Sequence, residues 1–253
     1  MKLSRAIRVL LGCLGVVGVL GAWELAARGA MNPSTFPSPT SAVLGALERV
    51  SGGDVADHIV TSLVRIAKGF GIGAVAGILI GVATGWYRLL DNLLRPTIEI
   101  LRPIPPLAWI PIAIVWFGLD EASKVFVISI AAFFPVLTNT YRGVAGIDPV
   151  ILRAALTMDA RGAGLLFKVA LPAAMPDIAI GLNVAWGLSF AVLVAAELIA
   201  ADSGLGYLIM NAREFGDVQV IIFGILLIGA CSLVTSWGIG LALRRWLGGW
   251  HPV

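Results

Sequence analysis

The sequence predicts an all-α integral membrane protein, and three properties lead to this fold class. The chain has 253 residues, of which 58% are hydrophobic and only 13% are charged. An ordinary globular domain has roughly 25% charged residues. Mean hydropathy is +0.94, which is too apolar for a chain that must cover its surface with polar groups. The apolar residues also gather in runs near the length of about 20 residues that a helix needs to cross a bilayer.

Six apolar runs are predicted to cross the membrane as helices, within a single transmembrane domain over residues 1–253. The first run opens after Lys2, Arg5 and Arg8, as a signal peptide would, but no convincing cleavage site follows it. We therefore interpret it as a retained helix. The third run is short and interrupted by prolines. The expected spans cover about residues 9–27, 62–86, 103–118, 123–141, 171–200 and 218–243.

Lysines and arginines beside the spans predict the orientation of the chain, because cytoplasmic loops are enriched in both. With a cytoplasmic N-terminus, twelve basic residues flank the inner ends of the spans and four flank the outer ends. We therefore expect both termini in the cytoplasm. The inner residues are Lys2, Arg5, Arg8, Arg88, Arg95, Arg102, Arg142, Arg153, Arg161, Lys168, Arg244 and Arg245, and the outer ones are Arg28, Arg49, Lys124 and Arg213.

Two of the connections between spans are predicted to contain helices. The inner connection over about residues 142–170 is the longest on its side, and its apolar residues recur at helical spacings. On the outer side, Ser38 followed by Pro39 resembles an N-cap with proline at the first helical position. We expect a short surface helix over residues 41–50 there, ended by Gly52 and Gly53.

The second span carries a glycine at every fourth position, which keeps these residues near one face of a helix. Without side chains on that face, a neighbouring helix can approach closely, so we expect helix packing there. Arg65 lies four residues before the first glycine and extends the face. Its side chain could attract an anionic solute, although we favour one that snorkels to the outer interface. The glycines are Gly69, Gly73, Gly77, Gly81 and Gly85.

Two groups of residues are candidates for lining a solute path. Four prolines fall within residues 102–111, and such backbone survives in lipid only when it is buried in protein or lies beside a wet cavity. A merely kinked helix is the alternative. Polar side chains in a membrane usually face the bundle interior or a water-filled path, and interhelical hydrogen bonds explain them equally well. The candidate path residues are Asn139, Asn183, Trp186 and Glu197, of which Asn183 and Trp186 share a helix face.

Nothing in the sequence indicates covalent chemistry or a bound cofactor. There is no G-x-x-x-x-G-K-[ST] phosphate loop and no H-E-x-x-H metal motif. Cys13 and Cys231 lie in apolar runs, as small packing residues do, so we expect no metal. The net charge of +3 is spread thinly along the chain, which argues against a nucleic-acid partner.

The inner connection carries the most specific motif. It contains Arg153-Ala154-Ala155, Asp159-Ala160 and Val169-Ala170-Leu171-Pro172, and it resembles the EAA signature of ATP-binding-cassette importer permeases. That signature reads E-A-A, three residues, G, nine residues, I-x-L-P, and the spacing here matches it. Arg153 stands in place of the family's glutamate, and Asp159 in place of its glycine. Because aspartate tolerates a positive φ less readily than glycine, Gly162 or Gly164 could take up the turn instead.

The resemblance extends over roughly residues 35–245, since residues 103–118, 121–124, 196–199 and 204–208 look like the nitrate/sulfonate/taurine branch of this family. It implies a permease subunit for a small anionic or zwitterionic solute, acting as a homodimer in the bacterial cytoplasmic membrane. The implied partners are two cytoplasmic ATPases and an extracytoplasmic solute-binding protein. In this family the inner loop docks on the ATPases, so the implied coupling residues are Arg153, Ala154, Ala155, Asp159, Ala160, Leu171 and Pro172.

A secondary transporter driven by an ion gradient is the alternative function. Such transporters often show internal inverted repeats and ionisable residues at the bilayer midplane. The sequence shows no repeated half, and the candidate midplane positions carry Asn183 and Trp186 rather than aspartate or glutamate. The coupling motif therefore favours the importer subunit, with ATP hydrolysis left to its partners.

Overall fold

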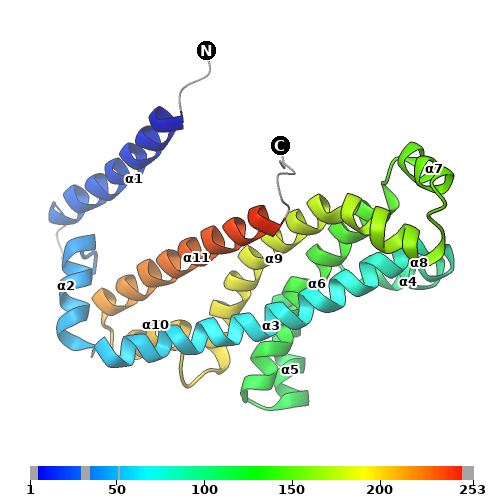
Figure 1. Cartoon of the computed structure of the whole chain (residues 1–253). Coiled ribbons are helices and arrows are strands. Elements are labelled where there is room, and N and C mark those ends of the chain that lie inside the picture. The colour runs from blue at the N-terminus through cyan, green and yellow to red at the C-terminus, as the bar shows by residue number, and fades with distance from the viewer. Residues whose placement is uncertain (1–4, 30–34, 51, 247–253) are drawn as a thin grey trace.

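The computed structural model describes residues 5–29, 35–50 and 52–246, and Lys2 of the orientation argument lies outside them. Within these ranges the regular structure is helical, with no strand (Figure 1). In chain order the elements are α1 (Arg5–Arg28), α2 (Pro39–Arg49), α3 (Gly52–Trp86), α4 (Arg88–Leu101), η1 (Pro106–Trp109), α5 (Ile110–Phe117), α6 (Glu121–Ala145), α7 (Pro149–Thr157), α8 (Gly162–Leu165), η2 (Leu166–Ala170), α9 (Leu171–Ala200), α10 (Leu205–Glu214) and α11 (Val218–Trp246).

Four helical segments of the described chain are long and apolar enough to cross a membrane. They are α3, α6, the continuous helix Gly162–Ala200 that includes α9, and the Val218–Leu243 part of α11. Helix α4 and residues Pro106–Phe117 meet at 87° and add a fifth crossing if they count as one span. The predicted all-α membrane fold is therefore confirmed. Helix α1 covers the first expected span but is not among these segments, so the count of six spans stays a prediction.

Some helices extend beyond the ends of the apolar runs that predict them, because the polar residues next to those runs are also helical. Helix α9 has the bounds predicted for the fifth span, whereas α3 begins at Gly52, ten residues before the predicted second span. Gly52 and Gly53 therefore start α3, because the polar turn containing Asp54 and Asp57 is helical but falls outside the apolar run. The apolar runs also do not predict α4 and α10, which are short and carry polar residues on one face.

The short outer helix is present as α2, and its start follows the predicted capping pattern. Pro39 is its first residue, and the hydroxyl of Ser38 accepts a hydrogen bond from the N–H of Ser41 at 3.3 Å. This bond satisfies one of the N–H groups that lack a partner at a helix start.

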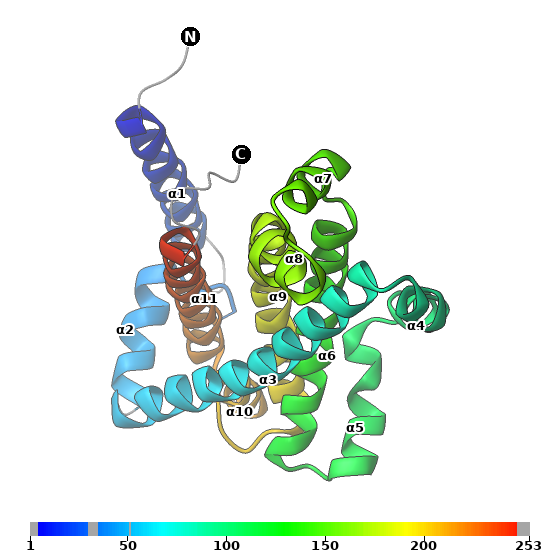
Figure 2. The ribbon, with the colours of Figure 1, turned by 45° about the vertical axis from the view of Figure 1, so that its right-hand side comes forward.

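The glycine face of α3 packs against α6 of the same chain, which confirms the predicted helix packing. A Cβ at Gly77 would lie 2.8 Å from the carbonyl oxygen of Phe133, and one at Gly81 would lie 2.7 Å from the Cβ of Thr140. Helix α6 also contacts α9, where a Cβ at Gly181 would lie 2.8 Å from the Cβ of Asn139. Helix α6 thus packs closely against both α3 and α9, and Figure 2 shows α3 crossing in front of the other two helices.

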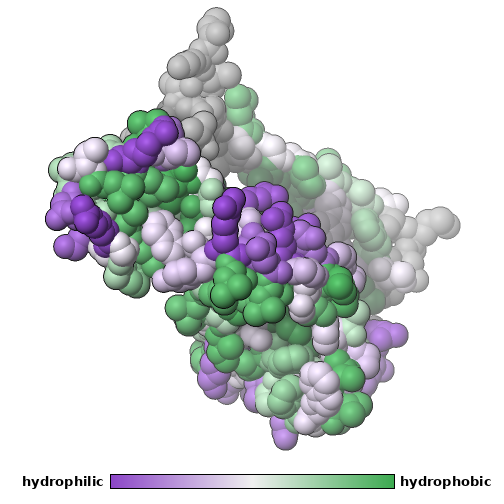
Figure 3. Space-filling model, turned by 90° about the vertical axis from the view of Figure 1, so that its right-hand side faces the viewer, coloured by the Kyte–Doolittle hydropathy of each residue, from purple (hydrophilic) through white to green (hydrophobic). Residues whose placement is uncertain are grey.

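The molecule has two ends that differ in their loops. Figures 1 and 2 place α7, the start of α1 and the end of α11 toward one end, and α10 with the α5–α6 turn at the other. Seen from the side of α4, hydrophilic side chains gather around α4 and α7, above a largely hydrophobic surface over α5 (Figure 3). Following the predicted orientation, we call the α7 end the inner end and the α10 end the outer end.

Candidate coupling loop and solute path

The turn after α7 holds the signature residues in a defined geometry. Asp159 has a φ of 61°, in the left-handed region. The N–H of Ala160 donates to the carbonyl of Ala155 at 3.0 Å, and the N–H of Asp159 donates to that of Leu156 at 3.1 Å. These two bonds form a Schellman motif, whose left-handed position is usually a glycine. The geometry explains why the signature has glycine at this position.

Asp159 therefore makes the turn itself, and the interpretation that Gly162 or Gly164 replaces it is wrong. Gly162, the first residue of α8, has a φ of 54° and is a second left-handed residue in this connection. The carboxylate of Asp159 pairs with Arg161 at 3.1 Å, and both side chains are exposed. Among the described residues, Asp159 does not pair with Arg153.

Helix α7 presents an unusually apolar surface for the polar inner end. None of its residues is buried, and Arg153 and Ala154 are exposed while Ala155 is half-buried. Exposed apolar patches of this kind mark interaction sites. The large apolar side chains exposed on α7 and its turn are Val150, Ile151, Leu156 and Met158, the last with 84% of its surface accessible.

The coupling loop is joined to the membrane helix without a break. Residues Gly162–Ala200 form one helix of 39 residues, which includes the π-helical turn η2. Leu171 and Pro172 are half-buried at the start of α9, just after the fully buried Ala170. These two residues lie where the loop continues into α9, whereas Arg153 and Ala154 are exposed on α7.

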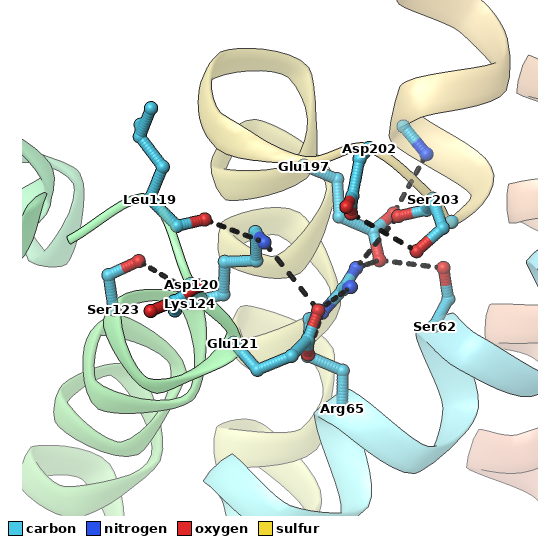
Figure 4. A network of polar contacts seen from close by, with 12 residues as sticks. Ser62, Arg65, Leu119, Asp120, Glu121, Ser123, Lys124, Glu197, Asp202 and Ser203 are labelled. Atoms are coloured by element: carbon cyan, nitrogen blue, oxygen red, sulfur yellow. Dashed lines mark hydrogen bonds and ion pairs between the residues drawn. The ribbon is translucent and has the colours of Figure 1, made fainter. Parts of the chain in front are cut away.

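At the outer end, Arg65 of α3 is buried between two carboxylates (Figure 4). Its guanidinium donates to Glu197 on α9, and its Nε donates to Glu121 at the start of α6 at 2.8 Å. A second guanidinium nitrogen also donates to Glu121. The expectation that Arg65 snorkels to the interface is therefore wrong, because its side chain has no exposed surface and its charge is neutralised within the protein.

Glu197 extends this network to the loop before α10. Its carboxylate accepts hydrogen bonds from the hydroxyl of Ser62 at 2.7 Å and from the N–H of Gly206 at 2.8 Å. Gly204 has a φ of 118°, and a Cβ there would lie 2.5 Å from the Glu197 carboxylate, so this approach requires glycine. The network ties together α3, α6, α9 and α10, and it leaves Glu197 engaged by protein groups rather than exposed to a path.

Trp186 and Asn183 lie in different environments although they are three residues apart. Trp186 is 7% exposed, packs edge-on against Phe70 and Phe190, and donates from its Nε1 to the hydroxyl of Thr235 at 3.3 Å. Asn183 is exposed. Residues three positions apart on a helix are separated by about 60° around its axis. The boundary between the buried and the exposed face of α9 lies between Trp186 and Asn183. Trp186 therefore makes an interhelical hydrogen bond, as the alternative interpretation expects, and its place on the solute path stays a prediction.

Asn139 borders a groove of about 300 Å³ between η1, α6 and α9. Its Nδ2 donates to the carbonyl of Pro135 at 2.8 Å, which holds the amide against α6. Val184 and Leu188 line the groove from α9, and Arg102 lines it from the proline-rich segment. Of the four predicted path residues, the structure thus places Asn139 on a groove and Asn183 on an exposed helix face, and it buries the other two.

Residues 73–247 match the family described as the binding-protein-dependent transport system inner membrane component. The chain belongs to this family. The taurine transport system permease TauC of Escherichia coli is 36% identical over 255 residues, covering 98% of this chain and 92% of that protein. The putative aliphatic sulfonates permease SsuC of Bacillus subtilis is 34% identical, covering 90% and 83%. The bicarbonate permease CmpB of Synechococcus elongatus is 39% identical, covering 74% and 68%.

Family membership confirms the resemblance to permeases of ATP-binding-cassette importers. Members of this family are multi-pass transport components of the inner membrane and not enzymes, and they work with ATPase subunits and a solute-binding protein. In the described residues no group of three or more His, Cys, Asp or Glu side chains is placed to hold a metal ion.

The sequence reasoning missed two members of the outer network, Ser62 and Glu121. A signal for them was available, because a charged residue inside an apolar span needs a partner. Arg65 is such a residue, and Glu121 and Glu197 are two of the few acidic residues next to the spans. What the sequence did not indicate is that the two carboxylates lie 56 and 132 positions further along the chain and meet at one guanidinium.

Proposed function

We propose that two copies of this chain form the translocation unit of the importer, and that α7 of each copy docks on one cytoplasmic ATPase. The observation that carries this proposal is the exposed apolar surface of α7, followed by its Schellman turn and joined to α9 by a continuous helix. A rigid helix transmits a displacement of the loop along its whole length. Nucleotide-driven movement of the ATPases would therefore reach the membrane through α9.

The predicted coupling residues divide into three roles in this proposal. Arg153, Ala154 and Ala155 form the contact surface, with the arginine facing an acidic residue of the ATPase where relatives with glutamate would need a basic one. Asp159 and Ala160 end α7 and set the angle of the loop. Leu171 and Pro172 join the loop to α9.

For the solute, we propose a small anion or zwitterion such as a sulfonate, taurine or nitrate, passing Asn139 and Asn183. The names of three relatives, a taurine, a sulfonate and a bicarbonate permease, support this class. We further propose that residues 1–253 form one permease domain with both termini in the cytoplasm. The solute-binding protein then docks at the outer end, where α2, α10 and the Arg65 network lie.

Uptake by the reconstituted complex tests this proposal. The chain is purified with its ATPase, placed in proteoliposomes, and supplied with the solute-binding protein and labelled taurine, ethanesulfonate, nitrate or bicarbonate. We expect uptake of at least one solute that needs both ATP and the binding protein, and a native mass with two permease and two ATPase subunits. Uptake driven by an ion gradient without ATP would support the secondary transporter instead.

A further inference from the structure

The groove between η1, α6 and α9 has a mostly apolar wall. Exposed side chains from α9 form one side of it, with Val184 53% and Leu188 38% accessible. The other side comes from the proline-rich segment and from α6, through Ile104, Pro106, Ile130 and Phe134. An apolar wall gains free energy by contact with methylene groups and gains none from a bare inorganic ion.

One cation stands at the edge of this groove. Arg102 lines both the groove and an adjoining pocket of about 190 Å³ between the inner end of α3, α4 and α6. Thr138 borders both cavities as well, so they are adjacent. A solute that moves from the groove toward the inner end therefore passes Arg102.

The guanidinium of Arg102 is available to bind an anion. Within the described part of the chain it has no carboxylate within 4.0 Å and its side chain makes no hydrogen bond, and the same holds for Arg142 in the adjoining pocket. Arg95 in that pocket differs, because it pairs with Glu99 at 3.0 Å and with Asp91 at 3.6 Å. An unpaired guanidinium offers several N–H donors in a planar arrangement that suits carboxylate, sulfonate and phosphate oxygens.

We propose that this groove is the part of the solute path that selects organic anions, with Arg102 binding the anionic group while the apolar wall contacts a short hydrocarbon body. This inference rests on the proposed function and narrows its solute class to organic anions such as alkanesulfonates. Inorganic oxyanions can use the guanidinium but not the wall. Each methylene added to the solute should therefore strengthen its binding in the groove by roughly two- to fourfold until the wall is covered.

Thiol labelling within the groove tests the charge selection directly. Val184→Cys is introduced in a background with Cys13→Ser and Cys231→Ser, and the complex with its ATPase is placed in proteoliposomes. Two methanethiosulfonates of similar size are compared, the anionic 2-sulfonatoethyl reagent and the cationic 2-trimethylammonioethyl reagent. Each rate is divided by the rate of the same reagent with a free thiol in solution. Leu188→Cys serves as a second reporter should the first variant fail to assemble.

We expect the normalised rate of the anionic reagent to exceed that of the cationic one by about fivefold or more. Arg102→Gln should bring the two rates together, Arg102→Lys should keep most of the difference, and Arg88→Gln, on the exposed face of α4, should leave it unchanged. Equal rates that do not respond to Arg102→Gln would overturn the proposal. So would a cysteine that neither reagent reaches at either position, because lipid or a second copy would then cover the groove.

Protection from labelling tests the apolar part. At equal concentrations, butanesulfonate should slow labelling of Cys at position 184 more than ethanesulfonate, and nitrate should slow it least. Equal protection by all three contradicts the role of the wall. Co-purification of the ATPase is measured on the same samples. A complex that assembles normally but shows no selectivity between the solutes overturns this inference alone. Loss of assembly in the parent protein counts against the proposed function.

Discussion

Arg65 on α3 and Glu197 on α9 form an ion pair in which neither side chain has any exposed surface. Their positions in the sequence differ by 132 residues, yet they meet where the outer ends of α3, α6 and α9 come together. Glu121 supplies the second carboxylate, and Ser62 and the N–H of Gly206 complete the partners of Glu197. The outer ends of three helices are thus joined by polar contacts, while their middle sections pack through glycines and apolar side chains.

Removing the arginine should be the most damaging single change in this network. Arg65→Met leaves the buried Glu197 without its charge partner, and loss of one member of a buried pair costs about 3–5 kcal/mol. Glu197→Gln should cost less, because Arg65 keeps Glu121. The thermal unfolding midpoint of the purified complex measures both, with Lys68→Met on the exposed side of α3 as the control. A midpoint for Arg65→Met equal to that of Lys68→Met would contradict this account.

The glycine face of α3 should not tolerate even a methyl group. At Gly77 a Cβ would approach the carbonyl oxygen of Phe133 to 2.8 Å, so Gly77→Ala must push α6 away and should cost about 1–3 kcal/mol. Gly71 lies on the same helix, and a Cβ there would have no neighbouring atom within 4 Å, so Gly71→Ala should be neutral or slightly stabilising. The yield and unfolding midpoint of the two variants are compared, and equal values would show that α3 and α6 are not closely packed.

The left-handed turn at Asp159 predicts an order of stabilities at that position. Glycine should stabilise the loop by up to about 1 kcal/mol relative to aspartate, and valine should destabilise it by about 1–2 kcal/mol, because a β-branched residue is strained at a φ of 61°. Met158 has a φ of −91°, so Met158→Val is the control. The rate of proteolytic cleavage within the loop measures the effect. Faster cleavage of Asp159→Gly than of Asp159→Val would contradict the turn geometry.

Asn183 should be accessible to water in at least one nucleotide state. We expect Asn183→Cys, in the background without Cys13 and Cys231, to react with small water-soluble thiol reagents and to change its rate when ATP is added. Ala185→Cys is the matched control, because Ala185 is fully buried two residues away. If the cysteine at position 183 never reacts in any state, or reacts no faster than the one at 185, Asn183 does not line the path.

Much of this fold could be predicted from the sequence, because a helix that crosses a bilayer must be long and apolar, and such apolar runs can be recognised in the sequence. The bounds of α9 and the cap of α2 by Ser38 follow from such local rules. The start of α3 at Gly52 could not be predicted in this way, since its first turns are helical but polar. Hydropathy marks the apolar part of a helix and not its ends.

The candidate site was less predictable because it depends on which helices meet. Spacing alone assigns Asn183 and Trp186 to one face, but the position of α3 and α11 around α9 buries the tryptophan and leaves the asparagine exposed. Likewise, the charge of Arg65 inside an apolar span indicates that this residue needs a carboxylate partner. That the partners are Glu121 and Glu197 depends on how the helices pack, which the sequence does not reveal. The signature marks position 159 as the turn, but aspartate there favoured a shift of the turn to Gly162 or Gly164, and only the structure shows that Asp159 itself adopts the left-handed conformation.

A charge placed on the contact surface of α7 tests most directly whether this helix couples the membrane helices to an ATPase. Ala155→Glu is compared with Asn92→Glu, which adds the same charge to the exposed face of α4, and Ala154→Glu provides a second variant on the exposed side of α7. Insertion and permease dimerisation, co-purification of the ATPase, and the ratio of solute taken up to ATP hydrolysed are measured for each. We expect both α7 variants to insert and dimerise normally but to lose the ATPase or lower the uptake ratio at least tenfold, with Asn92→Glu unaffected. Normal assembly and normal coupling in both α7 variants would contradict the coupling role of α7.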